Sequence, residues 1–406
     1  MPIKKVVCIA MTFPAPTETF HSNNTKALSE QGKEVIVFSL LPKHKDHNKL
    51  IEQRGLSKIK VNSCNVLNYM AGFMISIFHP LLSLSLVGFI LFNTRGKHLV
   101  KSLILIPRVF YIWSEICKEQ SDVVNLLWGH YPVLVGFLIK RTNPEILLSM
   151  GLLAYDLEMG YGGSGAIVPY VDFIWTQASI NIAQINKLGF NRIPIRVIYD
   201  GLDQKVSLGR KEKQPFSIIT IGRLIKSKGI DLCIRAFSLI ADSYPESCFH
   251  ILGDGPERKN LERLAAQLGL SERVIFRGHV SMEEVAAELA ASDVFLFMSY
   301  KVGERLPNVV KEAMLNKALC IVSETPGIEE LIQDGQTGFI LGKNSPEEAA
   351  KKIRRIFSER AEAELIRASA YDFVLGRFDC RKEMGKLVFE WENQLEARRE
   401  KKCVSA

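Results

Sequence analysis

The amino-acid sequence predicts an α/β protein with two doubly wound domains, each a parallel sheet with helices on both faces. Its 406 residues are enough for two domains of about 200 residues each. In the C-terminal half, short apolar runs typical of strands alternate with segments whose apolar residues recur at helical spacing. The N-terminal half repeats this alternation more loosely.

The same patterns place the individual elements. In the C-terminal half we expect strands at 216–221, 248–252, 274–276, 293–298 and 319–322, and helices at 230–240, 261–268, 285–290, 308–316 and 328–332. In the N-terminal half we expect strands at 6–11, 35–40, 123–128 and 146–149, and a helix at 20–30. The polar, basic stretch 203–215 is typical of a linker between a domain at 1–203 and a domain at 214–370. Residues 346–398 are strongly helical and charged.

Composition favours a folded protein from a reducing compartment. Hydrophobic residues make up 47% and charged residues 24%, a balance typical of soluble globular proteins and not of disordered chains. None of the eight cysteines forms a C-x-x-C pair, so we expect neither a disulfide framework nor a zinc site. The apolar run after Lys4 and Lys5 is too short for a signal peptide and is expected to be the first strand.

The positive charge of the chain is concentrated in one segment. The formal net charge is +8, and residues 41–108 hold ten Lys or Arg against two acidic residues, so this segment alone accounts for the whole excess. Aromatic or Gly-rich RNA motifs are not interleaved with these basic residues, so we expect no nucleic-acid partner.

Residues 61–94 carry no charge, and their apolar part, 69–92, is divided by His79-Pro80. Each piece is shorter than the ~20 residues of a membrane-spanning helix, and the proline favours a bend. Three interpretations remain open: a transmembrane helix, a pair of buried core helices, or partial insertion into one leaflet. Basic residues on both sides, among them Lys97 and Lys101, indicate an anionic membrane surface as the partner in the third interpretation.

The strongest local motif is G-E-R-L-P-N-V-V-K-E-A-M at 303–314, directly after the strand expected at 293–298. Glu304 then lies in the strand-to-helix loop, at the carboxyl edge of the sheet, where ligands bind in open α/β folds. Pro307 suits the first turn of the helix, and the N–H groups of 306–309 can hold a diphosphate. Taken alone, the motif also fits two solvated glutamates.

Two further loops follow strands of the same domain. Residues 222–231 supply Arg223 and Lys228, two cations that can converge on phosphate oxygens. In L-G-D-G-P at 252–256, the glycines let the backbone approach a ligand. Each loop alone also fits a solvated turn. Together, the three loops predict a site for an anionic diphosphate with hydroxylated groups on either side.

These motifs resemble family 4 of the retaining glycosyltransferases, which have the GT-B fold. The agreement runs over residues 215–345 and comprises G-R-L…K-G-x-D at 222–231, G-D-G-P at 253–256, F-x-G-x-V at 276–280, the E-x7-E pair Glu304 and Glu312, T-P-G-I-E-E-L-I at 325–332 and D-G-Q-T-G-F at 334–339. Upstream, P-T-E-T-F at 16–20 resembles members that build exopolysaccharide and lipid-linked glycans. No match can be placed at 45–120.

The resemblance implies two facing Rossmann-like, doubly wound domains, with a helix in 371–406 that crosses back to the N-terminal domain. It implies that Arg223 and Lys228 bind the donor diphosphate, that Glu312 holds the ribose hydroxyls and that Glu304 touches the donor sugar. The residues expected to bind the donor are Arg223, Lys228, Gly253, Asp254, His279, Val280, Glu304, Leu306, Pro307, Asn308 and Glu312. Glu18 and Asp156 are expected on the acceptor side.

Two departures from the family's pattern bear on the acceptor. Arg305 stands where many relatives have glycine, so its side chain can meet the sugar or the acceptor. The histidine that many relatives carry before the aspartate is missing ahead of Asp156. His130 is therefore a candidate catalytic residue, together with Glu304, Arg223 and Lys228, while a purely structural role for His130 stays open.

The expected reaction transfers a sugar from a nucleotide-sugar donor to a hydroxyl acceptor with retention, through front-face attack assisted by the leaving diphosphate. A growing polysaccharide or a lipid-linked glycan is the expected acceptor, met by a cytoplasmic enzyme peripheral on the inner face of the membrane. The donor loops contain no D-x-D motif, so we expect no metal and no other cofactor. Two alternatives remain: a GT-B sugar-nucleotide epimerase, and a catalytically silent, membrane-associated assembly subunit.

Overall fold

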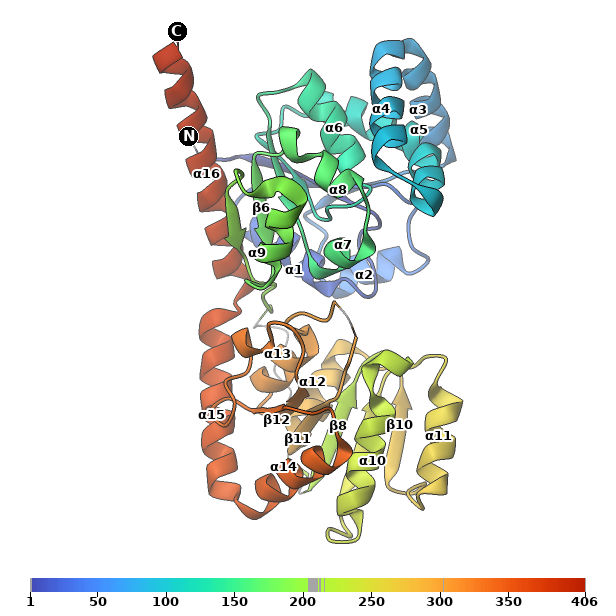
Figure 1. Ribbon diagram of the computed structural model, residues 1–406, viewed down its shortest axis with the longest axis vertical. Coiled ribbons are helices and arrows are strands. Elements are labelled where there is room, and N and C mark those ends of the chain that lie inside the picture. Colours follow the sequence, from blue (N-terminus) through green and yellow to red (C-terminus); the bar gives the residue numbers. More distant parts are fainter. Residues whose placement is uncertain (1, 204–210, 212, 215, 302, 406) are drawn as a thin grey trace. The chain divides into compact units, whose positions relative to one another are not determined.

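The chain divides into two compact units. The computed structural model describes residues 2–203, 211, 213, 214, 216–301 and 303–405. Unit 1 comprises Met1–Gly201 and Cys380–Ala406, and unit 2 comprises Leu202–Asp379 (Figure 1). Most of the linker expected at 203–215 lies outside the described residues. The domain ends expected at 203 and 370 differ from these bounds, because the helix that covers residue 371 stays in unit 2 and the chain rejoins unit 1 at Cys380.

Unit 1 is built on a seven-stranded sheet in the order β3-β2-β1-β4-β5-β6-β7, with every neighbouring pair parallel. Its strands are β1 (Lys5–Ala10), β2 (Glu34–Ser39), β3 (Lys60–Ser63), β4 (Val123–Leu126), β5 (Leu147–Gly151), β6 (Phe173–Thr176) and β7 (Ile195–Val197). The sequence patterns missed β3, β6 and β7. Strands β3 and β7 are short edge strands whose residues are only partly buried or exposed, and β6 is a buried strand of only four residues.

Helices cover both faces of this sheet because successive strand residues point to opposite sides. Val7 and Ile9 of β1 face one core and Val6 and Cys8 face the other, which is completed by α1 and α16. The buried indole of Trp391 fixes α16 in this second core. The helical segments besides α3 to α5 are α1 (Thr19–Glu30), α2 (His47–Gln53), α6 (Val133–Thr142), α7 (Ala154–Met159), α8 (Gly163–Ala166), η1 (Val168–Tyr170), α9 (Asn181–Ile185), η2 (Asn186–Phe190) and α16 (Cys380–Ser405).

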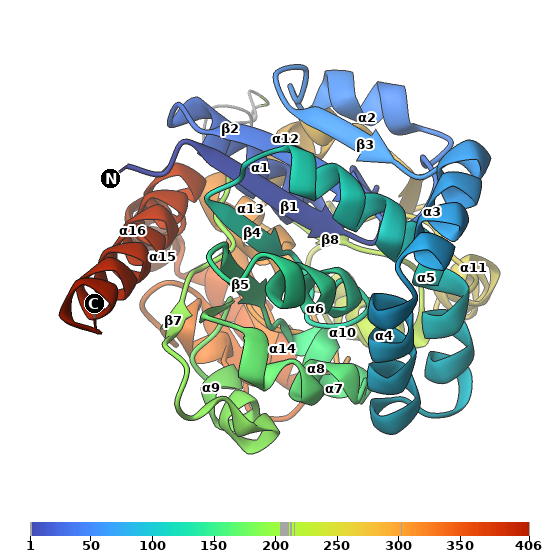
Figure 2. The same ribbon diagram turned by 90° about the horizontal axis from the view of Figure 1, so that it is seen from above.

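The uncharged segment of the sequence forms α3 (Val66–Phe78) and α4 (Pro80–Asn93), followed by α5 (Gly96–Lys118). In Figures 1 and 2 these three helices lie together at one edge of unit 1. A pair of buried core helices was the wrong interpretation for most of α3 and α4, since only Gly72, Leu86, Phe89 and Ile90 are buried there. Among the described residues, no single helix is long and apolar enough to cross a membrane; α3 and α4 together meet that test but are bent by 105°.

Unit 2 contains a six-stranded parallel sheet in the order β10-β9-β8-β11-β12-β13. Its strands are β8 (Ser217–Ile221), β9 (Cys248–Leu252), β10 (Val274–Gly278), β11 (Val294–Phe297), β12 (Leu319–Ser323) and β13 (Phe339–Leu341). Its helical segments are η3 (Lys226–Lys228), α10 (Ile230–Ala241), α11 (Arg258–Gln267), α12 (Met282–Ala291), α13 (Asn308–Leu315), η4 (Ile328–Glu330), α14 (Pro346–Ser358) and α15 (Arg360–Arg377). The expected doubly wound α/β class is confirmed in both units.

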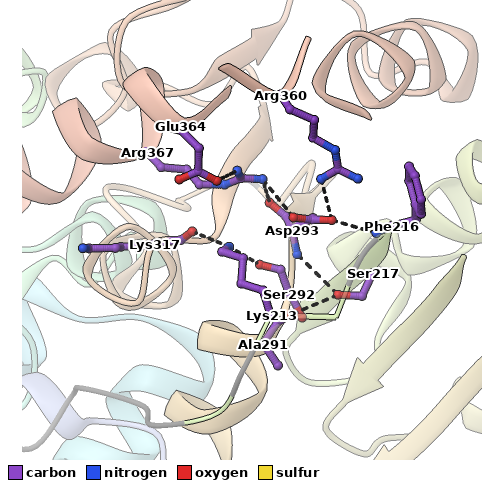
Figure 3. Close-up of polar contacts among 10 residues, drawn as sticks. All are labelled: Lys213, Phe216, Ser217, Ala291, Ser292, Asp293, Lys317, Arg360, Glu364 and Arg367. Carbon is purple, nitrogen blue, oxygen red and sulfur yellow. Dashed lines mark hydrogen bonds and ion pairs between the residues drawn. The ribbon is translucent and has the colours of Figure 1, made fainter. Parts of the chain in front are cut away.

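A charged cluster ties α15 to the amino-terminal edge of this sheet (Figure 3). The carboxylate of Asp293, just before β11, accepts hydrogen bonds from Arg360 at 2.8 Å, from Arg367 at 3.2 Å and from the backbone N–H of Phe216 at 2.7 Å. The Arg367 side chain is only 1% exposed. The ammonium of Lys213 donates to two backbone oxygens nearby, and burial lowers its pKa to about 8. This cluster lies at the amino-terminal edge of the sheet, whereas the candidate functional site lies at the opposite, carboxyl edge.

Candidate functional site

Four strand-to-helix loops of unit 2 meet at the carboxyl edge of its sheet, and their backbones interlock. The loop after β8 bonds to the loop after β9 through Leu224 N–H to Asp254 O, at 3.0 Å. Gly253 has φ +126°, and an added Cβ would lie 2.0 Å from Gly222 O. Gly229 has φ +62°, and an added Cβ would lie 2.0 Å from Met298 O. Glycine is thus required at both crossings, because a side chain at either would separate the loops.

The first pair of predicted site residues is in direct contact. Lys228 Nζ lies 2.6 Å from Glu304 Oε2, and both side chains are largely shielded from solvent. The Ser299 hydroxyl donates to the same carboxylate oxygen at 3.2 Å, and the Lys228 ammonium lies 5.1 Å from the centre of the Phe297 ring. The Lys228 ammonium is thus held by the Glu304 carboxylate and the Phe297 ring, which keeps it positioned for an anionic ligand.

The second pair is less constrained. Arg223 follows β8 and is exposed, and within the described part of the chain no ion pair or hydrogen bond is recorded for its guanidinium. Glu312 lies within α13, and burial raises the pKa of its carboxyl to about 7, against a smaller opposing effect of Lys311. No described side chain donates a hydrogen bond to this carboxylate. Among the described residues, the site therefore combines the guanidinium of Arg223, which has no protein partner, with the carboxyl of Glu312, which can still accept hydrogen bonds.

The N-terminus of α13 completes this edge. Helix α13 begins at Asn308, and Pro307 is its N-cap, one position before the first turn in which we expected it. Leu306 has φ +44°, a left-handed conformation that is rare for a branched side chain. Because the first N–H groups of a helix have no partner within it, this terminus presents donors to an anion.

The other predicted donor residues lie on the neighbouring loops. Gly253 and Asp254 follow β9, and His279 and Val280 follow β10, where His279 is exposed. A pocket of about 180 Å³ lies beside these loops, lined among others by Lys226, Asp231 and Tyr300. None of the five predicted donor residues with a charged side chain lines this pocket, so the predicted site lies at the open loop edge and outside this pocket.

The predicted acceptor-side residues form a separate cluster within unit 1. His130 Nδ1 lies 2.7 Å from Asp156 Oδ1, and the second oxygen of Asp156 accepts the N–H of Leu153 at 3.0 Å. The indole N–H of Trp128 donates to Glu18 Oε2 at 3.2 Å. Burial raises the pKa of Glu18, while the bond from Trp128 opposes the shift. His130 is thus held in one orientation by Asp156, which fits both a structural and a catalytic role.

Several residues of both clusters escaped the sequence analysis. Phe297 is the last residue of β11 and Ser299 lies in the loop directly after it, and this position at the carboxyl end of a strand was the available signal. In unit 1, His21 packs against Trp128 with ring centroids 5.1 Å apart. Burial lowers the pKa of His21 to about 3, and neither of its ring nitrogens has a partner among the described residues. Arg305, singled out as a departure, donates to Glu304 O at 3.2 Å.

The sequence is similar to known glycosyltransferases over parts of both units. Residues 203–373 match the family model described as glycosyl transferases group 1. An uncharacterised glycosyltransferase of Methanocaldococcus jannaschii is 26% identical over 310 residues, which cover 75% of this chain and 72% of that protein. The lipopolysaccharide core biosynthesis glycosyltransferase LpsE of Rhizobium meliloti is 27% identical over 266 residues, 61% of this chain and 75% of that protein.

Solved structures with the GT-B fold match nearly the whole chain. HepE of Anabaena, solved in complex with UDP, superposes with a TM-score of 0.73 over 96% of this chain and 100% of that chain, at 16% identity. Sucrose-phosphate synthase of Thermosynechococcus elongatus gives a TM-score of 0.71 over 97% of this chain and 100% of that chain, also at 16% identity. At this identity the likeness shows the fold, and the predicted GT-B architecture is confirmed.

Proposed function

This chain is a glycosyltransferase of the group 1 family, and from that premise we propose that it transfers a sugar with retention of anomeric configuration from a nucleotide-sugar donor held by unit 2. The observation that carries this proposal is the convergence of Lys228, Glu304 and Ser299 on one loop edge, with Arg223 and Glu312 on adjoining elements. Such a set supplies cations for a diphosphate and acceptors for sugar hydroxyls.

In the proposed step, the bond between the anomeric carbon and the diphosphate oxygen breaks, and the acceptor oxygen bonds to that carbon on the same face. The acceptor hydroxyl gives its proton to the departing diphosphate, so the nucleoside diphosphate leaves as the second product. Negative charge grows on the leaving oxygen, and Lys228 and Arg223 stabilise it. Glu304 then exchanges its contact with Lys228 for the donor sugar, and Glu312 accepts hydrogen bonds from the ribose.

Unit 1 would hold the acceptor. We assign Glu18, His130 and Asp156 to this side because polar side chains held by fixed hydrogen-bond partners can orient a hydroxyl. The acceptor class that we propose is a glycan attached to lipid or a growing polysaccharide, in line with the named role of LpsE in lipopolysaccharide core biosynthesis. The protein would then work as a peripheral enzyme on the cytoplasmic face of a membrane.

We further propose that no metal ion serves the leaving group. Arg223 and Lys228 already supply two positive charges at the loop edge, which is the electrostatic role that a divalent cation plays on a diphosphate. Among the described residues, no group of three His, Cys, Asp or Glu side chains is arranged to bind a metal.

The decisive experiment is a nucleotide-release assay over UDP-, GDP- and ADP-sugars, with uridine donors first because HepE was solved with UDP. We expect release of one nucleotide that depends on added glycolipid acceptor, and an NMR spectrum in which the product keeps the donor's anomeric configuration. An epimerase, which the comparisons do not support, would convert the donor without acceptor, and a silent subunit would release nothing. Either result, or an inverted product, would contradict the proposal.

A further inference from the structure

We propose that α3, α4 and α5 form a lipid-docking surface, which inserts apolar side chains into one leaflet of an anionic phospholipid membrane. Of the twenty-three large hydrophobic side chains that the described residues expose, fourteen lie between Val66 and Ile104. The most exposed of the fourteen are Val66, Leu67, Phe78, Leu81, Leu84 and Phe92, with Leu81 at 82% and Phe92 at 89%. Apolar patches so concentrated mark interaction sites.

Helix α3 carries no charged residue and is strongly apolar, a composition that belongs in a protein core or in a membrane. The inner face of α3 packs against α5. Gly72 approaches α5 so closely that an added Cβ would lie 1.8 Å from Pro107 O, and the Tyr69 hydroxyl donates to Ile104 O at 3.3 Å. The outer face carries Val66, Met70, Phe73 and Ile77 at helical spacing, and each of these side chains is more than half exposed.

Helix α4 anchors this surface to the body of unit 1. Leu86, Phe89 and Ile90 are buried, and the Phe89 ring stacks on Phe137 of α6 at 4.5 Å between centroids. The exposed apolar side chains are therefore presented by a packed element. The 105° bend between α3 and α4, together with these buried contacts, fits shallow insertion better than a span.

The charges around the lipid-docking surface indicate which partner binds it. No acidic residue occurs from 53 to 114, and the apolar side chains border on the exposed Arg95 and Lys97. Lys101 adds a third cation on the same helix, with its ammonium 4.4 Å from the Tyr131 ring. A basic rim around apolar residues complements anionic headgroups above acyl chains. Docking of a second copy of this chain would instead bring two basic rims together, which is unfavourable.

Vesicle flotation tests this surface on the full-length protein without donor or acceptor. We expect the wild type to float with vesicles of phosphatidylcholine and phosphatidylglycerol, less with phosphatidylcholine alone, and less in high salt. The double variant Leu81→Ser/Phe92→Ser should reduce partitioning at least about tenfold, since two large apolar side chains no longer insert. Its matched control, Leu365→Ser/Phe389→Ser, removes comparably exposed side chains of α15 and α16 and should float as the wild type does.

A second pair of variants tests the contribution of the basic residues to membrane binding. Arg95→Glu/Lys97→Glu should lose the preference for the anionic vesicles, whereas Lys259→Glu/Lys351→Glu, which changes two exposed lysines of unit 2, should keep it. Absence of wild-type flotation, or equal flotation of all variants, overturns the proposal. A dimer interface would also overturn it. In that case ultracentrifugation would show a wild-type dimer, and of all the variants only Leu81→Ser/Phe92→Ser would be monomeric, while it would still float with the vesicles. Nucleotide release measured without vesicles should be unchanged in every variant, so failure of docking and failure of the proposed transfer are distinguished.

Discussion

Lys228 Nζ and Glu304 Oε2 lie 2.6 Å apart, although 76 residues separate them in the sequence. The contact joins the turn before α10 to the loop before α13, which are the two elements whose sequence motifs were the most specific. Each side chain thus restricts the orientation of the other. Under the proposed function, a diphosphate that attracts the ammonium would release the carboxylate for the sugar, so that binding of one half of the donor would prepare the contact for the other half.

Replacement of Lys228 tests the role assigned to its charge. Lys228→Ala should lower kcat roughly 100- to 1,000-fold, because stabilisation of the leaving diphosphate grows in the transition state. KM for the donor should change much less. The control is Lys226→Ala, in the same turn, whose exposed side chain lies at the separate pocket. Equal effects of the two substitutions on kcat would contradict the assignment.

The raised pKa of Glu312 predicts a pH dependence of nucleotide binding. Burial holds this carboxyl partly protonated near its pKa of about 7, and ribose hydroxyls donate best to the ionised form. Affinity for the nucleoside diphosphate should therefore rise as the pH increases through 7 and level off above it. Glu312→Gln should lack this component and show only the ionisation of the phosphate itself. Identical affinity profiles for the two proteins would remove Glu312 from the ribose site.

The grouping of the predicted donor residues at one edge of unit 2 could be predicted from the sequence, because these residues follow strand ends within single loops. Glu304, Arg223 and Lys228 each come just after a buried apolar run, and parallel strands bring such positions to one edge. The partners Phe297 and Ser299 were not found, because a phenylalanine at the end of a strand and a serine in the loop after it carry no chemical signal of their own. The exposure of α3 could not be predicted from the sequence either, because an apolar helix has the same sequence pattern in a core and on a surface.

The cluster of Figure 3 depends on residues distant in sequence, which is why no local pattern indicated it. Arg360 and Arg367 reach Asp293 from 67 and 74 positions away. Asp293→Ala should lower the free energy of unfolding by about 3–5 kcal/mol, because the buried Arg367 would lose its buried carboxylate partner and keep only the exposed Glu364. Denaturant titration measures this loss.

Glu364→Ala is the control for that substitution. Glu364 also contacts Arg367, but its side chain is 63% exposed, so its removal should cost less than about 1 kcal/mol. A larger loss from Glu364→Ala than from Asp293→Ala would show that the buried pair does not hold α15 to the sheet.

Metal dependence is a separate prediction. If Arg223 and Lys228 carry the charge compensation, activity should survive treatment with EDTA and should not rise when Mg²⁺ or Mn²⁺ is returned. The measurement is nucleotide release in matched buffers, with a known metal-dependent glycosyltransferase as the positive control for chelation. Loss of activity with EDTA and its rescue by a divalent ion would place a metal on the diphosphate instead.

The most direct test of the donor site is calorimetry of UDP, GDP and ADP on the wild type, Arg223→Ala and Glu312→Ala, with folding of each variant checked by circular dichroism. We predict that one nucleotide binds the wild type. Each substitution should weaken it roughly 10- to 100-fold, because each removes charge-assisted hydrogen bonds. Unchanged affinity in both folded variants would contradict the placement of the donor at this edge of unit 2.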